Sequence, residues 1–321
     1  MSAVTMRAVT QEAFGGPEVL RVREVPRPEP LPTEVLVRVH AAGVNPVDWK
    51  TRSNSGVAGV LGEPPFVLGW DVSGVVEAVG FGVTTLRVGD EVFGMPWFPR
   101  AAGGYGEYVT APARQFAHKP GTIDHEHAAA VPLAALTAWQ ALMDTARVQA
   151  GQRVLVHAAA GGVGHFAVQF AKHLGAHVLA TASQGHHMWL TGIGADEVID
   201  YTTTPFEHSA ADVDVVLDLV GDIHDNTSIR SLEVLRPGGL LVSIPTGVSP
   251  ELAAAAQQRG VRVSSFLVEP DGPSLTRIAN LIDSGQVEVA VAEVFPLEHA
   301  AAAHVRGEKG RTRGKLVLRI V

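Results

Sequence analysis

The chain has 321 residues, of which 46% are hydrophobic and 18% are charged, and its formal net charge at pH 7 is −8. This length is enough for about two domains with a substantial core. The acidic balance argues against binding to nucleic acid or to an anionic membrane surface through bulk charge. The sequence has no cysteine, which excludes disulfides, a thiolate nucleophile and thiolate zinc ligands, and which suits a cytoplasmic location without proving one.

Neither a signal peptide nor a membrane span is predicted. The first residues, MSAVTMRAVTQEAFGG, lack the basic segment followed by an apolar segment that marks a signal peptide. The uncharged stretch 154–171 has the length of a membrane span, but it contains two histidines and three glycines. Its pattern changes from strand-like to helical, so we predict a strand, a turn and a helix there and no contact with a membrane.

Residues 1–125 are predicted to form short strands. Apolar segments alternate there with Gly and Pro; they are TMRAVT, VLRVREV, EVLVRVHAAG, VSGVVEAVG, DEVFG and GEYVTAP. This pattern is typical of a β-barrel or a β-sandwich. The segment PRPEPLPTE at 26–34 is predicted to be an extended surface arm, and a ligand for a proline-recognition domain is the alternative.

The pattern changes near residue 130. VPLAALTAWQALM predicts a helix with Pro132 in its first turn. Apolar strands then alternate with helical segments; the strands are RVLVHA, HVLATA, EVID, VDVVLDLVG, GLLVSI and VRVSSFLV. This alternation predicts an α/β domain with a doubly wound parallel sheet covered on both faces. The tail from about 267 ends in another strand, KLVLRIV, which we expect to return to the first domain.

The segment AAGGVG at 159–164 has the pattern of a dinucleotide-binding turn, because a strand precedes it and a helix follows. Ala159 stands at the first glycine position. Gly161 would let the backbone approach a pyrophosphate, and Gly164 would let the helix pack closely on the strand. The free N–H groups at the helix N-terminus would face the phosphates. We therefore predict cofactor contacts from this turn, with a plain glycine turn as the alternative; the residues are Ala159, Gly161, Gly162, Val163 and Gly164.

No acidic residue ends the next strand, HVLATA. A site for NAD would place Asp or Glu there to bind the ribose 2′-hydroxyl. Instead Ala182 is followed by SQGHH, whose hydroxyl and imidazole groups can donate to a 2′-phosphate. NADPH is therefore favoured over NADH, although the loop contains no Arg or Lys. Thr181, Ser183 and His187 are predicted to contact the cofactor, and solvated histidines are the alternative.

These and further motifs resemble the medium-chain dehydrogenase/reductase superfamily, and most closely its zinc-independent quinone oxidoreductase branch, which includes zeta-crystallin-like and enoyl-reductase-like enzymes. The motifs are GVNPVDWK, RVGDEVFG, LTAWQAL, GIGADEVIDY and the terminal GKLVL, and they cover essentially the whole chain. The resemblance implies a GroES-like β-barrel catalytic domain from residues 1–127 and 265–321, with a Rossmann domain at 128–264. It also implies NADP(H) as cofactor and a homodimer, with contact through edge strands near VRVSSFLV as one arrangement.

The resemblance also implies hydride transfer to quinones or α,β-unsaturated carbonyl compounds without zinc. The first catalytic cysteine of the zinc branch falls at Asn45, and its His-Glu pair falls at Trp70 and Asp71. Alcohol oxidation needs an alkoxide, whose formation a metal promotes, whereas electron-poor acceptors take a hydride readily, so hydrogen bonds suffice to stabilise the developing charge. A dedicated enoyl reductase of a biosynthetic pathway and a non-catalytic NADPH-binding redox sensor remain as alternatives.

Five residues are predicted to serve catalysis, each with a structural alternative. Asn45 would orient the acceptor carbonyl, or form the turn before Pro46. Asp48 would anchor the loop or Lys50 rather than transfer a proton. Trp49 would line the substrate pocket or lie in the core, and Lys50 would stabilise an enolate, supply a proton or remain exposed. Thr137 is expected close to the nicotinamide.

Further cofactor contacts are predicted at strand ends and in the C-terminal segment. Carboxyl ends of parallel strands bind ligands in open sheets. On this ground, contacts are predicted from Val220, Gly221, Ile244, Pro245 and Thr246. Tyr201 is similar to a residue of the family that packs near the adenosine phosphate, with strand-end packing as the alternative. Backbone contacts to the carboxamide are expected from Phe266, Leu267 and Val268, and Lys315 is expected at the edge of the cofactor cleft.

Two remaining clusters are given structural interpretations. His125, Glu126 and His127 are too close in sequence for an ordinary tetrahedral metal site, so a polar loop before a helix is expected. The basic run RGEKGRTRGKLVLR at 306–319 has no interleaved aromatic residues, so a solvated loop is favoured over a nucleic-acid site.

Overall fold

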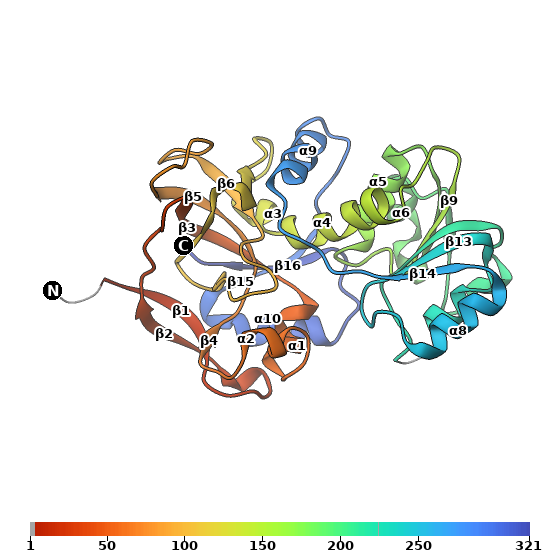
Figure 1. Ribbon diagram of the computed structural model, residues 1–321, viewed down its shortest axis with the longest axis horizontal. Coiled ribbons are helices and arrows are strands. Elements are labelled where there is room, and N and C mark those ends of the chain that lie inside the picture. The colour runs from red at the N-terminus through yellow and green to blue at the C-terminus, as the bar shows by residue number, and fades with distance from the viewer. Residues whose placement is uncertain (1–3, 224) are drawn as a thin grey trace. The chain divides into compact units, whose positions relative to one another are not determined.

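The computed structural model describes residues 4–223 and 225–321. Two compact units divide the chain: residues 1–136, 269–285 and 289–321 form unit 1, and residues 137–268 and 286–288 form unit 2 (Figure 1). The domain boundaries expected at 127/128 and 264/265 stay a prediction, and the observed units change over at 136/137 and 268/269.

Unit 1 is built on two sheets, as its strand-rich sequence predicts. A three-stranded sheet has the order β2-β1-β4, and a seven-stranded sheet has the order β15-β16-β3-β5-β6-β8, with β7 paired to β3. The strands are β1 Thr5–Gln11, β2 Leu20–Pro26, β3 Glu34–Val44, β4 Phe66–Val67, β5 Asp71–Val79, β6 Glu91–Gly94, β7 Tyr108–Pro112, β8 Phe116–His118, β15 Val291–Pro296 and β16 Lys315–Arg319.

The helices of unit 1 are short, and several begin with a proline or a side-chain cap. Pro46 and Pro132 are the first residues of their helices, where the missing N–H is not needed. Asp124 accepts a hydrogen bond from His127 N–H at the start of another. The helices are α1 Pro46–Arg52, α2 Ala58–Leu61, α3 His125–Ala129, α4 Pro132–Gln140, which crosses into unit 2, α9 Gly272–Asp283 and α10 Ala300–Glu308.

The C-terminal strand returns to the N-terminal part of the chain, as predicted. β16 pairs antiparallel with β3, so that Leu316 lies opposite Val44. β3 also pairs antiparallel with β5, where Gly43 lies opposite Asp71. These two registers bring the first residue of β16, the first residue of β5 and the residue after β3 to one end of the sheet.

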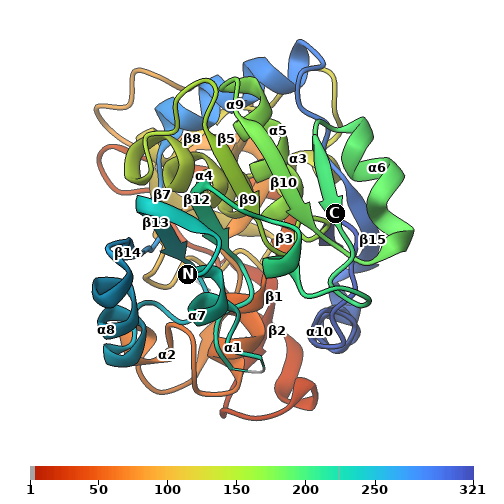
Figure 2. The same ribbon diagram turned by 90° about the vertical axis from the view of Figure 1, so that its right-hand side faces the viewer.

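Unit 2 is a six-stranded parallel sheet with the order β11-β10-β9-β12-β13-β14, which confirms the predicted doubly wound fold (Figure 2). Figure 1 shows α5 and α8 on opposite sides of this sheet. The strands are β9 Arg153–Val156, β10 His177–Thr181, β11 Glu197–Ile199, β12 Val213–Asp218, β13 Leu235–Ser243 and β14 Arg262–Ser265. The helices are α5 Gly164–His173, α6 His187–Gly192, α7 Thr227–Ser231 and α8 Pro250–Arg259.

The core of unit 2 explains why these segments form buried strands. Leu155, Leu179, Val216 and Leu241 come from four strands and pack in one cluster with Leu232, Leu252 and Ala256. The four inner strands, β9, β10, β12 and β13, are rich in apolar residues and are buried along most of their length, as expected for a parallel sheet that helices cover. This core fixes the carboxyl ends of the strands, from which the candidate cofactor residues emerge.

Candidate functional site

The turn after β9 has the geometry of a phosphate-binding turn. Its backbone is tied by hydrogen bonds from Gly161 N–H to Ala158 O at 2.9 Å and from His165 N–H to Gly161 O at 3.2 Å. In the described part of the chain, the N–H groups of Gly162 and Val163 have no backbone acceptor. Both residues are half-buried, and they lie directly before the first residue of the ten-residue helix α5. The two amides are therefore open to an anion at the positive end of a helix.

Gly164 is required by close packing rather than by an unusual backbone angle. A Cβ atom at this position would lie 2.5 Å from Ala158 O and 2.6 Å from Ala159 Cα, and both are backbone atoms that cannot move aside easily. Gly161 is less restricted, because its Cβ would lie 3.2 Å from Ala158 O. The packing at Gly164 is what the sequence pattern predicts for this position.

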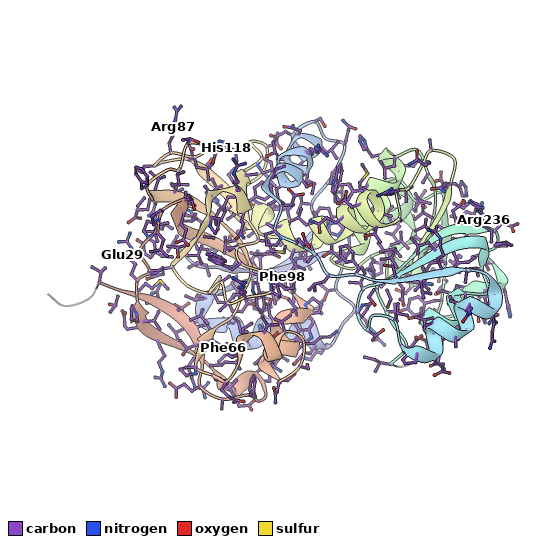
Figure 3. The ribbon with its side chains drawn as sticks, viewed as in Figure 1. Glu29, Phe66, Arg87, Phe98, His118 and Arg236 are labelled. Atoms are coloured by element: carbon purple, nitrogen blue, oxygen red, sulfur yellow. The ribbon has the colours of Figure 1, made fainter. Side chains whose placement is uncertain are left out.

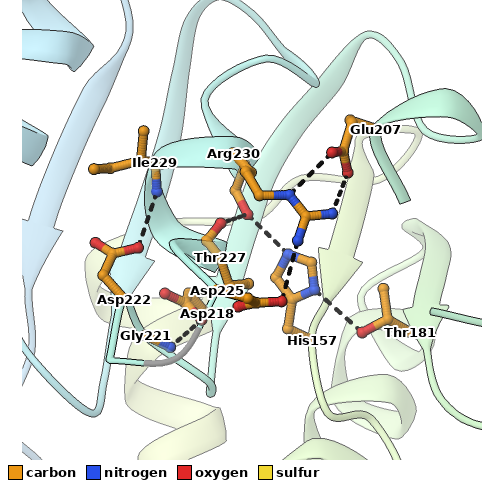
Figure 4. A network of polar contacts seen from close by, with 11 residues as sticks. His157, Thr181, Glu207, Asp218, Gly221, Asp222, Asp225, Thr227, Ile229 and Arg230 are labelled. Atoms are coloured by element: carbon orange, nitrogen blue, oxygen red, sulfur yellow. Dashed lines mark hydrogen bonds and ion pairs between the residues drawn. The ribbon is translucent and has the colours of Figure 1, made fainter. Parts of the chain in front are cut away.

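A buried polar network holds the turn to the neighbouring strands (Figure 4). His157 Nδ1 lies 3.1 Å from the Thr181 hydroxyl, and His157 Nε2 lies 2.9 Å from the Ser231 hydroxyl. Thr181 also accepts from Ala158 N–H at 3.3 Å through its hydroxyl and from Ala159 N–H at 3.1 Å through its carbonyl. Thr181 therefore supports the turn, and its hydroxyl already has protein partners. Burial lowers the pKa of His157 to about 4, so the imidazole is neutral at pH 7.

The loops after β12 and β13 lie in contact. Asp218 Oδ1 accepts from the N–H groups of Val220 and Gly221 at 2.9 and 3.0 Å, and Ser228 donates to the other oxygen (Figure 4 labels Asp218 and Gly221). Gly221 has φ 79°, and a Cβ there would lie 2.9 Å from the Thr246 side chain. The structure thus brings together Val220, Gly221, Pro245 and Thr246.

The loop after β10 lies near an acidic residue, Asp200, which is distant from it in the sequence. Ser183 and His187 are half-buried, and His187 Nε2 lies 3.3 Å from Ala182 O. Asp200 follows the adjacent strand β11. Hydrogen bonds from Thr202 lower the pKa of Asp200. The charge of His187 and the Gln184 N–H group also lower it, by smaller amounts. The cofactor loop therefore lies close to a carboxylate that another strand supplies.

The remaining predicted cofactor residues of unit 2 differ in exposure. Tyr201 is 57% exposed beside Asp200, whereas Val268 is buried. Phe266 and Leu267 lie in the irregular segment after β14, and Thr137 is buried in α4. Tyr201 and Leu267 are accessible to a ligand, but their predicted cofactor contacts stay predictions.

A buried polar cluster in unit 1 surrounds Asn45. The Lys315 ammonium donates to Asn45 Oδ1, to Val44 O at 3.2 Å and to Asp71 Oδ2 at 3.4 Å. Asn45 Nδ2 donates to Asp71 Oδ2 at 2.8 Å. The side chain of Lys315 is only 3% exposed. All three of its hydrogen-bond donors are used inside unit 1. The predicted cofactor contact of Lys315 did not anticipate this buried position.

The partners of Asn45 fix the orientation of its carboxamide. Lysine can only donate and an ionised carboxylate can only accept, so the oxygen must face Lys315 and the nitrogen must face Asp71. One hydrogen on Nδ2 then has no partner among these groups. Asn45 is nearly fully buried at 1% exposure. Its arrangement is that of an amide donor pre-oriented by charged neighbours.

Asp48 contacts Asn45 from the other side. Asp48 Oδ2 accepts from Asn45 N–H at 2.6 Å and from the Tyr105 hydroxyl at 3.0 Å. The expected anchoring of this loop by Asp48 agrees with the first bond, whereas Lys50 is not among the partners of Asp48. Beyond Tyr105, His304 Nε2 lies 3.2 Å from the tyrosine oxygen, and Arg52 donates to His304 Nδ1 at 3.2 Å.

Burial changes the acidity of this cluster. It raises the pKa of Asp48 to about 7, against hydrogen bonds from Asn45 and Tyr105 that lower it. It also raises the pKa of Asp71, where Lys315 opposes the rise, and raises the pKa of Tyr105 well above its usual value. Burial, with a smaller effect of the Arg52 charge, lowers the pKa of His304 to about 3.

Trp49 and Lys50 lie on α1 next to this cluster. The Trp49 ring is half-buried, packs over Gly307 of α10 and makes an edge contact with His304 at 6.2 Å between ring centroids. Lys50 is half-buried. These contacts support the alternative that Trp49 packs inside unit 1. Its predicted role in lining the substrate pocket stays a prediction.

Unit 1 also contains an apolar cavity of about 390 Å³. Phe66, labelled in Figure 3, lines it together with Met6, Trp97 and Tyr108. None of the residues that line it is Asn45, Asp48, Asp71 or Lys315. The cavity is therefore separate from the polar cluster.

The residues of HEH at 125–127 have divergent partners. They form the first turn of α3, not the loop before a helix that the sequence suggested, because Asp124 caps this helix. His125 lies 2.8 Å from the Ser73 hydroxyl, His127 lies 2.7 Å from Asp124, and Glu126 pairs with Arg319 at 2.6 Å. The basic run is mostly not the expected solvated loop: residues 306–308 end α10, Lys315 and its neighbours in β16 are buried, and only residues 309–313 form a largely exposed loop.

Sequence reasoning did not select Tyr105, His304 and Arg52, and it named Asp71 only by its position in the resemblance. A signal exists for Asp71, because it begins the otherwise apolar strand DVSGVV. The other three are single polar residues in ordinary segments, and only the tertiary fold shows that they are buried.

The family models match both parts of the chain. An alcohol dehydrogenase GroES-like domain matches residues 31–121, and a zinc-binding dehydrogenase matches residues 193–318. In the part of the chain that the structure describes, no helix combines the length and the apolar character that a bilayer span requires.

Two curated relatives match nearly the whole chain. The mitochondrial NAD(P)H oxidoreductase RTN4IP1 of Danio rerio is 33% identical over 90% of this chain and 84% of its own length. The quinone oxidoreductase of Mus musculus is 34% identical over 98% of this chain and 97% of its own length.

Solved structures agree with these matches. The quinone oxidoreductase from Coxiella burnetii has a TM-score of 0.93 and 37% identity, with 99% of this chain and 100% of the other covered. The Escherichia coli quinone oxidoreductase complexed with NADPH has a TM-score of 0.84 and 31% identity, with 98% and 100% covered. The chain therefore belongs to the medium-chain dehydrogenase/reductase superfamily, in its quinone oxidoreductase branch.

Proposed function

We propose that this protein is an NADPH-dependent oxidoreductase that transfers hydride to quinones or to α,β-unsaturated carbonyl compounds without zinc. The observation that carries the proposal is the turn after β9, where the N–H groups of Gly162 and Val163 lack backbone acceptors within the described residues. These amides, at the start of α5, suit a diphosphate. The names of the mouse and Escherichia coli relatives support a quinone as acceptor.

Three observations bear on the choice between NADPH and NADH. The loop after β10 offers Ser183 and His187 to a 2′-phosphate, and the Escherichia coli relative is described as complexed with NADPH. Asp200 acts in the opposite direction, because its carboxylate repels a phosphate and lies near His187. We propose that the protein prefers NADPH to NADH, and that the Asp200 carboxylate makes this preference smaller.

The residues around Asn45 do not fit a zinc site, although one matching family model describes a zinc-binding dehydrogenase. Zinc in proteins takes four ligands drawn mainly from Cys and His. The oxygen atoms of Val44, Asn45 and Asp71 instead accept hydrogen bonds from the Lys315 ammonium. Among the described residues, no group of three or more His, Cys, Asp or Glu side chains could hold a metal ion.

The proposed reaction uses the polar groups of unit 1 to stabilise charge on the acceptor. The bound cofactor supplies a hydride from its nicotinamide ring. The remaining Nδ2–H of Asn45 would donate to the acceptor oxygen, where negative charge develops as the hydride is added. Quinones and conjugated carbonyls are electron-poor, so this donation replaces the help of a metal ion. Lys50 is the proposed source of the proton that completes the reduction, and solvent is the alternative source.

A turnover assay after treatment with a chelator tests the proposal. The purified protein is mixed with NADPH or NADH and with quinones, enones, enals and enoyl thioesters, and oxidation of the reduced nicotinamide is followed. We expect acceptor-dependent oxidation of NADPH that the chelator does not change. Activity on enoyl thioesters alone would select the dedicated enoyl reductase, and tight NADPH binding without turnover on any acceptor would select the redox sensor.

A matched pair of variants separates the role of Asn45 from general damage. Asn45→Ala removes the proposed donor, whereas Asn280→Ala alters an exposed asparagine on α9. We expect Asn45→Ala to lower kcat by about 10²-fold, the usual loss for one donor to a developing oxyanion. Equal kcat values for both variants would contradict the role proposed for Asn45.

We also propose a small-molecule acceptor as the only partner besides a second copy of this chain. Strand β14 forms one edge of the six-stranded sheet, so its outer backbone groups are available for pairing with another strand. The molar mass in solution, measured by light scattering, tests the homodimer. The cytoplasmic location stays a prediction.

A further inference from the structure

Two buried carboxylates and one buried ammonium surround Asn45. Asp48 and Asp71 are both fully buried, and the Lys315 ammonium contacts Asp71. Arg52 is the other buried cation nearby, but it pairs with Glu308 at 2.5 Å. If both carboxylates were ionised, the cluster would hold one negative charge in excess. An uncompensated buried charge is unfavourable, so one of the two carboxylates is expected to carry a proton.

Asp71 is the less favourable place for that proton. Its Oδ1 accepts from Leu133 N–H at 2.6 Å, and its Oδ2 accepts from Asn45 Nδ2 at 2.8 Å and from Lys315 at 3.4 Å. A proton on Oδ2 would meet a donor hydrogen at either lone pair, and a proton on Oδ1 would weaken the attraction to the Lys315 ammonium. The contacts of Asp71 therefore select its ionised form.

Asp48 has one oxygen that is open to a proton. Its Oδ2 accepts from Asn45 N–H and from Tyr105, whereas its Oδ1 is buried and has no hydrogen-bond partner in the described part of the chain. A bare buried carboxylate oxygen is costly, because it has lost water and gained nothing. A proton on Oδ1 removes the negative charge and leaves both contacts of Oδ2 intact.

The contacts behind Tyr105 fix the direction of this chain of hydrogen bonds. Arginine can only donate, so Arg52 makes His304 Nδ1 an acceptor and places the histidine hydrogen on Nε2. That hydrogen donates to the Tyr105 oxygen, and Tyr105 in turn donates to Asp48 Oδ2. His304 cannot pass a proton along, because Arg52 occupies its other nitrogen. This series of hydrogen bonds holds Asp48 in place and does not relay protons.

We propose that the two carboxylates have different roles: Asp71 is the ionised partner of Lys315, and Asp48 is a neutral acid that positions the backbone of Asn45. Asp48 is thus a positioning residue, and the functional part of this inference rests on the proposed role of Asn45. When Asp48 ionises at high pH, the excess charge disturbs the Lys315–Asp71 pair and the carboxamide that this pair orients.

The charged groups that face Asp48 support this assignment. They are Asp71 on β5, Lys315 on β16, and Arg52 and His304 behind Tyr105. Burial and, to a smaller extent, the charge of Asp71 raise the pKa of Asp48, whereas the hydrogen bonds from Asn45 and Tyr105 and the charge of Lys315 lower it; the pKa that results is about 7. His304 and Tyr105 stay neutral near pH 7, since burial lowers the pKa of the first and raises that of the second. Asp48 is therefore the group in this series of hydrogen bonds that titrates near pH 7.

Two isosteric substitutions test the proposal through stability, without reference to activity. Asp48→Asn imitates the neutral acid, and Asp71→Asn removes the ionised partner of Lys315. The exposed Asp144→Asn serves as a control for the change in charge. An aspartate whose pKa is raised in the folded protein loses stability as pH rises from the unfolded value of about 4 to the folded value. The Tm of Asp48→Asn minus that of the wild type should therefore rise between pH 5 and pH 7 and then level off.

The other two variants should behave differently. Asp71→Asn should lower the Tm at pH 7, because it leaves a buried ammonium without its partner. Asp144→Asn should give a difference that does not change with pH. Stabilisation by Asp71→Asn together with destabilisation by Asp48→Asn would overturn the proposal. If Asp48→Asn fails to fold, the infrared band of a protonated carboxylic acid in the wild type decides: it should be present at pH 6 and fade by pH 8.5, and its absence at pH 6 overturns the proposal.

Activity provides a separate readout. If the neutral acid is the functional form of Asp48, the wild type should lose kcat above pH 7 and Asp48→Asn should show no such fall. A kcat reduced by about 10²-fold, with the pH dependence unchanged, would show that the ionised form is required. If no acceptor is reduced at all, the proposed function fails, while the stability measurements still decide the protonation of Asp48.

Discussion

The Lys315 ammonium donates a hydrogen bond to the side-chain oxygen of Asn45, although 270 residues separate the two positions. The contact arises from strand register, since Leu316 on β16 lies opposite Val44 on β3. The cation is buried, and Asp71 provides its counter-charge. The cluster thus acts as a fixed electrostatic support for one amide group.

Lys315→Met should destabilise the protein and impair turnover. The substitution leaves the Asp71 carboxylate buried without its cation, and breaking a buried pair in this way typically costs about 3–5 kcal/mol. We expect a lower Tm and a lower kcat with little change in the KM for NADPH, because the ammonium contacts Asn45 rather than the cofactor turn. The exposed Lys309→Met is the control. A large rise in the KM for NADPH with normal kcat would instead support the cofactor contact first predicted for Lys315.

Gly164→Ala should weaken cofactor binding and stability together. Its Cβ would lie 2.5 Å from Ala158 O, so the turn and the start of α5 must separate. Overpacking of this kind typically costs about 1–3 kcal/mol. Gly192→Ala on α6 is the matched control, because its Cβ meets nothing within 4 Å. Thermal unfolding and titration calorimetry with NADPH measure both effects, and equal results for the two variants would contradict the role of Gly164.

Ser183→Asp should shift the cofactor preference toward NADH. A carboxylate in the loop after β10 repels a 2′-phosphate and can bind a 2′-hydroxyl. We expect the KM for NADPH to rise by at least about tenfold, with a smaller change for NADH. Asp200→Asn should have the opposite effect, because it removes the carboxylate near His187. Ser209→Asp, at an exposed position, controls for the added charge. A KM ratio that neither variant changes would show that this loop does not bind the 2′-position.

Acid should destabilise the protein partly through His157. Burial lowers the pKa of His157 to about 4 from its ordinary 6.5. A group with a lowered pKa of this kind loses its stabilising effect as pH falls from the unfolded value to the folded value. The difference corresponds to about 3 kcal/mol between pH 6.5 and pH 4. His157→Asn should show a smaller fall in Tm over this range than the wild type. An identical slope would assign the acid sensitivity to other groups, such as His304.

The sequence allowed the fold and the cofactor turn to be predicted because their signals are local. Strand β9, the glycines at 161–164 and the helix after them lie within 20 residues of one another, and each has a pattern of its own. The parallel sheet followed from the alternation of apolar and helical segments. The first turn of α3 differs from the predicted loop because Asp124 caps the helix there.

The polar cluster of unit 1 could not be predicted in the same way. Its members come from β3, β5, β16, α1 and α10, and the registers of three strands bring Asn45, Asp71 and Lys315 together. Nothing in the sequence near Tyr105 or His304 distinguishes a buried hydrogen-bonded residue from an exposed one. Sequence reasoning selected Asn45 and Asp48 and expected a loop there, whereas Asp48 lies in α1 with Asn45 as its N-cap, and it could not identify the charges that face them.

The central claim is that the turn after β9 binds the diphosphate of the cofactor through its backbone amides. An NADPH titration followed by the amide nuclear magnetic resonance signals of unit 2 tests it most directly. We predict that the N–H signals of Gly162 and Val163 shift more than those of Gly192, which lies away from the turn on α6. Saturable binding of NADPH that leaves the Gly162 and Val163 signals unmoved would contradict the account.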